Sequence, residues 1–323
     1  ENCLFGVDIN PKSVMICQLR LWIELLKNAY FNPKGELETL PNIDINIKCG
    51  NSLISRFALD EDLSDVFRRQ KFSRADYLDA VQAYKQVRSK EGKEELRAFI
   101  QRIKNEFRQT VFNRNPYVRQ LSQKRGQLVL LDNNLDLFGE ARKDAATVEK
   151  ERRKLDAEIA AIEQQLEEYK TGPLYRNSFE WRFEFPEVLD DAGNFRGFDV
   201  VVGNPPYIRQ EELGPFKNHF QNAFDTYAGT ADLYVYFVER GMKVLAPGGR
   251  FSYILPNKWM RAGYGDKLRR FVRNECRIEA VTDFGDLPVF EEATTYPCIL
   301  ELQNAAPADT FPAASLDTLN FES

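Results

Sequence analysis

The apolar segment 198–202 ends abruptly at the loop Gly203-Asn204-Pro205-Pro206-Tyr207. A short apolar run bounded by turn residues is typical of a buried strand in a parallel sheet. The two prolines stop the strand, because each fixes its own φ and lacks a backbone donor. In open parallel sheets, ligands bind at the carboxyl ends of the strands. This loop therefore predicts an α/β architecture and the sheet edge at which a site would lie.

Strand-like and helix-like segments alternate on both sides of this loop. Before it, residues 4–9 and 43–49 read as strands, and residues 13–30 between them read as a helix that is mostly buried. Asn10 and Pro11 suit the cap and first turn of that helix. Further strands are expected at 179–185, 250–255, 278–284 and 298–302, with helices at 233–245 and 264–274. The order predicts an α/β fold: a mixed, seven-stranded type of sheet with helices on both faces and 298–302 closing it.

The middle of the chain has a different character. Glycine and proline become rare, and residues 56–154 hold 23 Lys/Arg against 16 Asp/Glu in a chain of net charge -5. Such a basic region contacts phosphate in some proteins and is only a solvated helical surface in others. Near its end, five apolar residues recur at spacings of 4, 3, 4 and 3, which predicts a seam packed on a neighbouring helix: Leu155, Ile159, Ile162, Leu166 and Tyr169.

These shifts predict four parts. Residues 1–55 and 176–303 form the two parts of an α/β core, and residues 56–175 form a helical insertion. Residues 304–323, rich in Ala, Pro, Asp and Ser, form a linker.

Composition excludes several classes of function. Mean hydropathy is -0.47 and no apolar run reaches the roughly 20 residues that span a bilayer, so we expect no membrane partner and a cytoplasmic protein. Five scattered cysteines without a CxxC pair indicate reduced thiols rather than disulfides or a zinc site. A single histidine, His219, makes a Ser-His-Asp triad or a multi-histidine metal site improbable, and we expect no metal.

The loop after residue 202 has a specific chemistry. The side-chain carbonyl of Asn204 and the backbone carbonyl of Pro205 can act as paired acceptors, with Pro206 stiffening the turn. Paired acceptors suit an exocyclic amino group, which has two hydrogens, and they steer its lone pair toward an electrophile. Tyr207 offers a flat ring on which a base can stack.

With this motif the chain resembles the N6-adenine DNA methyltransferases that use S-adenosylmethionine, and among them the type IIG restriction–modification and BREX-like phage-defence enzymes of prokaryotes. Other stretches match in order: residues 5–11, 49–54, 181–188 with Phe-Pro-Glu-Val, 230–234, 248–259 and 289–300. The resemblance implies a Rossmann-like class I methyltransferase fold, double-stranded DNA as partner, and possible further subunits or domains of a restriction or defence system.

The resemblance also implies roles for single residues. Asp8 would hold the cofactor ribose, and Phe290 would supply a second aromatic ring against the target base. Four further residues would contact the cofactor's adenine: Ile9, Asn51, Ser52 and Leu53. Each has an ordinary structural alternative: an acid beside a helix start, a turn-forming asparagine, or core packing. Asp232 is expected near the catalytic loop or as a helix cap.

Two departures from the family pattern matter. No GxG segment lies between residue 1 and Asp8, and the chain ends in the predicted linker. We therefore expect an internal part of a longer protein, which by itself binds cofactor weakly and does not methylate. Two alternatives stay open: a methyltransferase of the same motif that acts on RNA or on protein glutamine, and a non-catalytic core with a helical partner-binding arm.

Overall fold

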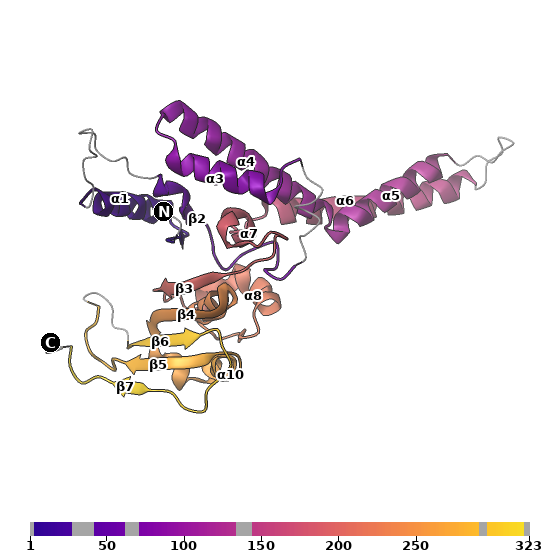
Figure 1. Cartoon of the computed structure of the whole chain (residues 1–323). Helices are drawn as coiled ribbons and strands as arrows, with labels where there is room; N and C mark the ends of the chain where they lie inside the picture. The colour runs from indigo at the N-terminus through magenta and orange to yellow at the C-terminus, as the bar shows by residue number, and fades with distance from the viewer. Residues whose placement is uncertain (1–2, 28–41, 62–70, 134–143, 291–295, 320–323) are drawn as a thin grey trace. The chain divides into compact units, whose positions relative to one another are not determined.

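The computed structural model describes residues 3–27, 42–61, 71–133, 144–290 and 296–319 (Figure 1). The chain divides into two compact units, each described here by itself. The first comprises Glu1–Phe57, Glu61–Glu187 and Asp191–Gly193, and the second comprises Ala58–Asp60, Val188–Asp190 and Asn194–Ser323. Both combine strands with helices, so the predicted mixed α/β class is confirmed.

A two-stranded parallel sheet begins the first unit. Strand β1 (Gly6–Asp8) pairs with β2 (Ile47–Cys49), and helix α1 (Pro11–Lys27) connects them through residues that include the 3-10 turn Ile43–Ile45. Helix α1 starts as predicted: Pro11 occupies its first position, and the Asn10 side chain accepts the N–H of Lys12 (2.9 Å). The residues predicted to end this helix, 28–35, lie outside the described residues.

The predicted strand over 43–49 is wrong in its first half. Asp44 forms ion pairs with Lys93 and Arg97 on a later helix and accepts a hydrogen bond from the Tyr84 hydroxyl (2.7 Å). The side chain of buried Asn46 donates to the carbonyl of Leu4 (2.9 Å). Because these polar residues have partners elsewhere in the fold, the period-2 alternation does not indicate a strand with one solvent-exposed face.

Helix α1 is also less buried than predicted. Of its side chains only Val14 is buried, while Met15, Leu19 and Trp22 have exposed fractions of 66, 57 and 46%. Dense apolar residues indicate how much surface a helix can bury. They do not show how much of that surface the neighbouring elements cover.

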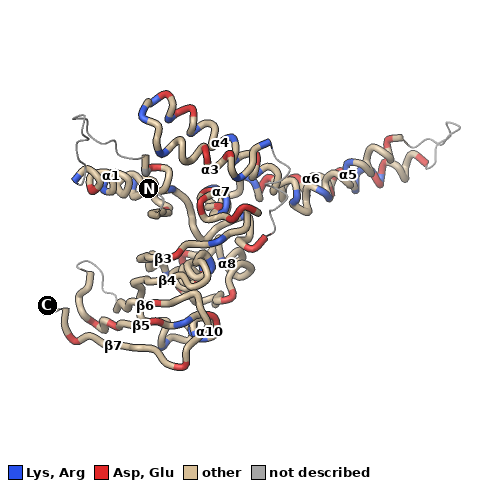
Figure 2. The backbone as a smooth tube through the Cα atoms, in the orientation of Figure 1, with Lys and Arg blue, Asp and Glu red and all other residues tan. Residues whose placement is uncertain are grey.

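The described residues of the predicted helical insertion form the long helices α3 (Arg74–Gln86), α4 (Lys90–Asn113), α5 (Pro116–Asp132) and α6 (Ala145–Thr171). The seam on α6 is confirmed, because Leu166 is buried, its four companions are half-buried, and α6 packs along α5; at the end of the seam the Tyr169 ring lies beside Phe112 of α4. Both charge signs alternate along this hairpin (Figure 2), and ion pairs such as Lys124–Glu158 (2.6 Å) cross it. That pattern is typical of a solvated helical surface.

Residues 179–185 were predicted as a strand and instead contain a short helix, α7 (Trp181–Glu184). The alternation of aromatic and charged residues misleads here, because the charged residues are buried as well as the aromatic ones. Glu180, Arg182 and Glu184 have exposed fractions of only 3, 4 and 8%. The segment is enclosed on all sides, so a period of two does not separate a core face from a wet face.

The second unit is built on a five-stranded sheet in the order β3-β4-β6-β5-β7. Its strands are β3 (Phe198–Gly203), β4 (Leu245–Pro256), β5 (Arg277–Asp283), β6 (Pro297–Gln303) and β7 (Ala313–Ser315). The remaining elements are α8 (Lys217–Ala223), α9 (Tyr234–Lys243), α10 (Asp266–Glu275) and 3-10 turns at Gln210–Phe216, Asn257–Met260 and Gly263–Gly265. Strands β3 and β4 are parallel, whereas β6 runs antiparallel to both β4 and β5.

Three details differ from the sequence prediction. Strand β6 does not close the sheet but lies in its middle, and the edge strand β7 comes from the segment 304–323 predicted as a linker. The predicted turn at 247–249 is a bulge within β4, with Gly248 at φ 79° and its N–H donating to the carbonyl of Asn304 (2.8 Å). The seven strands of the described residues also form two sheets rather than one.

Candidate active site

The two segments assigned to the cofactor lie together at one edge of the first unit. Strands β1 and β2 are parallel with Asp8 opposite Cys49, so both carboxyl ends reach the same edge. The N–H of Gly50 donates to the Asp8 carbonyl (2.9 Å), which joins the loop after β2 directly to the end of β1. Parallel pairing thus brings together two segments that lie about forty residues apart in the chain.

Asp8 and Asn51 each keep part of their hydrogen-bonding capacity. Asp8 is exposed; its Oδ1 accepts the N–H of Asn10 (2.7 Å), while its Oδ2 has no partner within the described residues. Asn51 Oδ1 accepts the N–H of Leu53 (3.1 Å), so the side chain shapes its own turn. Its Nδ2 group likewise lacks a described partner. An acceptor oxygen and an amide donor at one edge fit a nucleoside, with its vicinal hydroxyls and ring nitrogens.

The apolar residues beside them differ in exposure. Ile9 has an exposed fraction of 55%, whereas Leu53 is buried at 1% and Ser52 is half-buried. Leu53 therefore belongs to the core of the turn. Ile9 is the apolar side chain that the edge presents to solvent.

The Asn204–Tyr207 loop follows β3 in the second unit, as predicted. Gly203 pairs with Tyr253 of β4, so Asn204 begins the loop at the carboxyl edge of these two parallel strands. Asn204 and Pro206 are exposed, Pro205 is buried and Tyr207 is half-buried. A buried proline between exposed neighbours anchors the loop, while the Asn204 amide has no hydrogen-bond partner in the described parts of the chain.

The structure brings Tyr207 and Phe290 together, although 82 residues separate them in the sequence. Their ring centroids lie 6.5 Å apart with an interplanar angle of 71°, an edge-to-face contact. A base held between two rings needs about 7 Å and nearly parallel planes, since each contact takes about 3.5 Å. The Tyr207 hydroxyl is buried without a described partner, and burial raises its pKa, so it is a neutral donor open to a ligand.

Sequence reasoning missed a chain of hydroxyls beside this loop. The Tyr264 hydroxyl donates to the Asp232 carboxylate (3.4 Å) and lies 2.9 Å from the Tyr234 hydroxyl. The N–H of Leu233 donates to the carbonyl of Ile208 (3.0 Å), which joins this segment to the residue that follows the Asn204–Tyr207 loop. Asp232 was predicted either to lie near this loop or to cap a helix. No side chain caps helix α9, so the first of these predictions is favoured. Burial raises the pKa of the Asp232 carboxyl group. The sequence signal for this cluster was the motif Asp232-Leu233-Tyr234.

Two kinds of feature are missing from the described residues. They contain no group of three or more His, Cys, Asp or Glu residues that could hold a metal ion. None of their helices is long and apolar enough to cross a membrane.

Comparison with known proteins gives a consistent result. The chain is 39% identical over 112 residues to the type II methyltransferase M.XhoI of Xanthomonas vasicola, covering 34% of this chain and 20% of that protein. It is 35% identical over 120 residues to the type II restriction enzyme and methyltransferase RM.Eco57I of Escherichia coli, covering 35% of this chain and 12% of that protein. The chain thus spans a fifth or less of the length of these two relatives.

A solved structure and a family pattern extend the comparison. The type IIL restriction-modification enzyme MmeI, solved in complex with DNA, is 13% identical with a TM-score of 0.33, over 52% of this chain and 26% of that one. The pattern of the Eco57I restriction-modification methylase family matches residues 2–290, which include every residue of the candidate site. The chain therefore belongs to the Eco57I restriction-modification methylase family.

Proposed function

We propose that this chain carries the catalytic residues of an S-adenosylmethionine-dependent DNA adenine-N6 methyltransferase of a restriction–modification or phage-defence system. The observation that carries the proposal is the Asn204–Tyr207 loop at the carboxyl end of β3, with Tyr207 beside Phe290. Family membership supports methylation in a restriction–modification context.

The loop residues have distinct roles in this proposal. The Asn204 side-chain carbonyl and the Pro205 carbonyl accept the two hydrogens of the adenine amino group, which leaves its lone pair free to attack. Pro206 holds the backbone in the conformation that aims both acceptors. Because the loop is set before the substrate arrives, its dipoles need little reorganisation during the reaction.

A target adenine must leave the DNA stack before these acceptors can reach its amino group. Tyr207 and Phe290 then hold the extruded ring by stacking. Because the two rings contact each other edge to face, we expect them to separate and turn when the base enters. That rearrangement makes the aromatic pair a filter for flat, unpaired bases.

The cofactor residues belong to the first unit. Asp8 would accept hydrogen bonds from the ribose hydroxyls, and Asn51 and Ser52 would contact the adenine of S-adenosylmethionine, with Ile9 against its ring. When bound, this cofactor supplies an electrophilic methyl group. In the same proposal residues 56–175 are an insertion in the catalytic core.

The decisive experiment uses the full-length protein, labelled S-adenosylmethionine and genomic DNA. Mass spectrometry identifies the modified base, with Asn204→Ala as the test variant. His219→Ala is the matched control, because His219 lies in α8 and has no role in the proposal. We expect N6-methyladenine with the unchanged protein and the control, and loss of label by at least a hundredfold in Asn204→Ala.

Other outcomes would redirect the proposal. Label on RNA or on protein glutamine would assign the same loop to a different planar acceptor. A folded protein that binds the cofactor yet labels nothing would contradict catalysis by this chain and favour the helical insertion as a partner-binding arm.

A further inference from the structure

The segment 177–181 leads into helix α7, whose first residue is Trp181, and has no role in the proposed chemistry. It lies in the first unit alongside the turn 50–56, which carries Asn51 and Ser52. Ser178 forms a parallel bridge with Asn51, and the carbonyl of Asn177 accepts the N–H of Asn51 (2.6 Å). The N–H of Phe179 donates to the carbonyl of Ile54 (2.8 Å). The two segments are thus joined by backbone hydrogen bonds at both ends of the turn.

Side chains also pack closely between the segment 177–181 and the turn 50–56. A Cβ atom at Gly50 would lie 2.8 Å from Cδ2 of Phe179, so the ring rests against the backbone where the turn begins. Glu180 has an exposed fraction of 3%, and its carboxylate accepts hydrogen bonds from the Ser55 hydroxyl (2.7 Å) and from the N–H of Arg56 (3.1 Å). One buried carboxylate therefore fixes the end of the turn.

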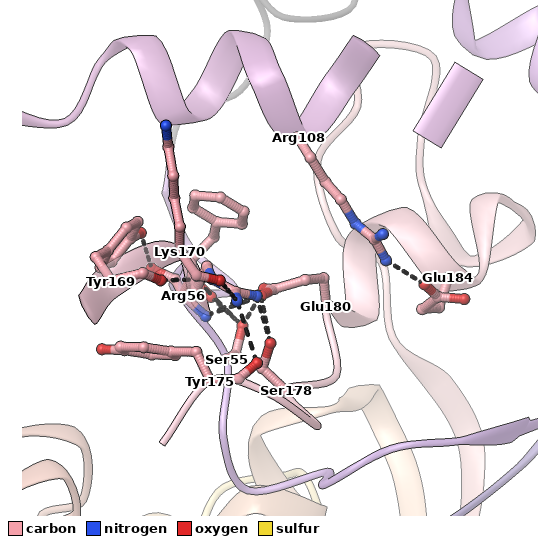
Figure 3. A network of polar contacts seen from close by, with 10 residues as sticks. Ser55, Arg56, Arg108, Tyr169, Lys170, Tyr175, Ser178, Glu180 and Glu184 are labelled. Atoms are coloured by element: carbon pink, nitrogen blue, oxygen red, sulfur yellow. Dashed lines mark hydrogen bonds and ion pairs between the residues drawn. The ribbon is translucent and has the colours of Figure 1, made fainter. Parts of the chain in front are cut away.

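Arg56 ties the same turn to the base of the helical insertion (Figure 3). Its guanidinium donates to the carbonyls of Tyr169 (3.1 Å) and Lys170 (3.0 Å), in the last turn of α6. It also donates to the carbonyl of Tyr175 (3.1 Å) and forms an ion pair with Glu180 (3.3 Å). The final carbonyls of a helix lack partners within the helix. The Arg56 guanidinium supplies hydrogen-bond donors to two of them, and its positive charge interacts favourably with the negative end of the helix dipole.

Trp181 makes a side-chain contact with the backbone of a proposed cofactor residue. Its indole N–H donates to the carbonyl of Ser52 (3.1 Å), and its ring packs edge to face on Phe179, with centroids 5.0 Å apart. Phenylalanine at this position would keep an aromatic ring, remove the donor and lose the smaller ring of the indole. Trp181→Phe therefore deletes the hydrogen bond to Ser52 while an aromatic ring still packs beside Phe179.

We infer that Trp181 and Arg56 are positioning residues for the cofactor turn, and that the helical insertion is the scaffold which holds this turn in its binding conformation. The inference rests on the proposed function, because it assumes that the turn 50–53 binds S-adenosylmethionine. Neither residue touches the cofactor; each acts through the backbone of the turn.

The test measures the Kd for S-adenosylmethionine by calorimetry and the Tm by scanning calorimetry in the full-length protein. Trp181→Phe should raise Kd about 3- to 10-fold, the effect of one lost hydrogen bond, with Tm lowered by no more than a few degrees. Arg56→Lys should raise Kd further, since an ammonium group cannot reproduce the planar fork. Trp22→Phe is the matched control on the exposed face of α1, and its Kd should equal that of the unchanged protein.

The outcomes separate the inference from the function on which it rests. An unchanged Kd in both Trp181→Phe and Arg56→Lys, even with a lower Tm, would show a merely structural role and overturn the inference. If the unchanged protein does not bind S-adenosylmethionine at all, the proposed function fails and the inference fails with it. A raised Kd in Trp181→Phe at nearly unchanged Tm supports positioning.

Discussion

The ion cluster around Glu184 joins several elements of the first unit, and we expect its loss to lower the free energy of unfolding. Glu184 Oε2 lies 2.5 Å from Lys104 Nζ and 3.4 Å from Lys48 Nζ, and its Oε1 lies 2.8 Å from Arg108 Nη2. Lys48 belongs to β2, Lys104 and Arg108 to α4, and Glu184 to α7. One buried carboxylate thus joins three elements and forms ion pairs with three cations.

Glu184→Gln would leave these cations facing a neutral amide. Removing one partner from a buried ion pair costs about 3–5 kcal/mol, because the remaining charge stays desolvated. Arg108 keeps 37% of its side chain exposed and can turn to water, so we expect the lower end, about 3 kcal/mol. The measurement is denaturant unfolding at pH 7, with hydrogen exchange over α4 and α7 to assign the loss to the first unit.

The pH dependence gives a second, independent readout. Burial and the neighbouring Lys48 lower the pKa of Lys104 to about 8, although Glu184 opposes that shift. The unfolded pKa is about 10.4, so the unfolded state binds more protons between these values, and this group's contribution to stability rises with pH across that window. Glu184→Gln lowers the pKa of Lys104 further, so the variant's stability deficit relative to the unchanged protein should narrow as pH rises toward about 8 and stay constant above it.

A matched double variant completes the test. Lys104→Met in the Glu184→Gln background removes one of the uncompensated cations and should recover part of the lost stability. A loss below about 1 kcal/mol for Glu184→Gln at pH 7, or no recovery in the double variant, would refute the reasoning that this cluster is a coupled buried unit.

Three further predictions concern packing and thiol accessibility. Gly50→Ala should destabilise the first unit by about 1–3 kcal/mol in thermal unfolding, because its Cβ would meet the Phe179 ring; a variant as stable as the original would contradict that close approach. Leu166→Ala should cost about 2–3 kcal/mol and speed hydrogen exchange along α5 and α6, whereas equal exchange would mean that the seam does not hold the hairpin. Among the cysteines of this chain, Cys3, Cys17 and Cys49 are exposed, whereas Cys276 and Cys298 are buried, and burial raises the pKa of each buried thiol to about 12. Maleimide should therefore label the three exposed thiols in the folded chain and all five after unfolding, read as mass increments. Early labelling of Cys276 or Cys298 would disprove their protection.

Some features follow from local sequence, because their physical causes are local. Asn10 and Pro11 start α1, and the spacing from Leu155 to Tyr169 forms the seam of α6. The loop Asn204-Pro205-Pro206-Tyr207 ends β3, because two prolines cannot continue a strand. In each case the residues that produce the structure are neighbours along the chain, so pattern and outcome coincide. The order of α/β elements and the helical middle were predictable on the same grounds.

Other features were decided only when distant segments met. Asp44 and Glu184 lie in patterns that read as strands, yet both segments are helical and their carboxylates pair with cations of α4. Phe290 reaches Tyr207, and Trp181 reaches Ser52, through contacts that no spacing announces. The sequence by itself determined the class of fold and the position of the Asn204–Tyr207 loop at the end of β3. Tertiary structure decided which charges are buried, because burial depends on what the rest of the chain packs against them.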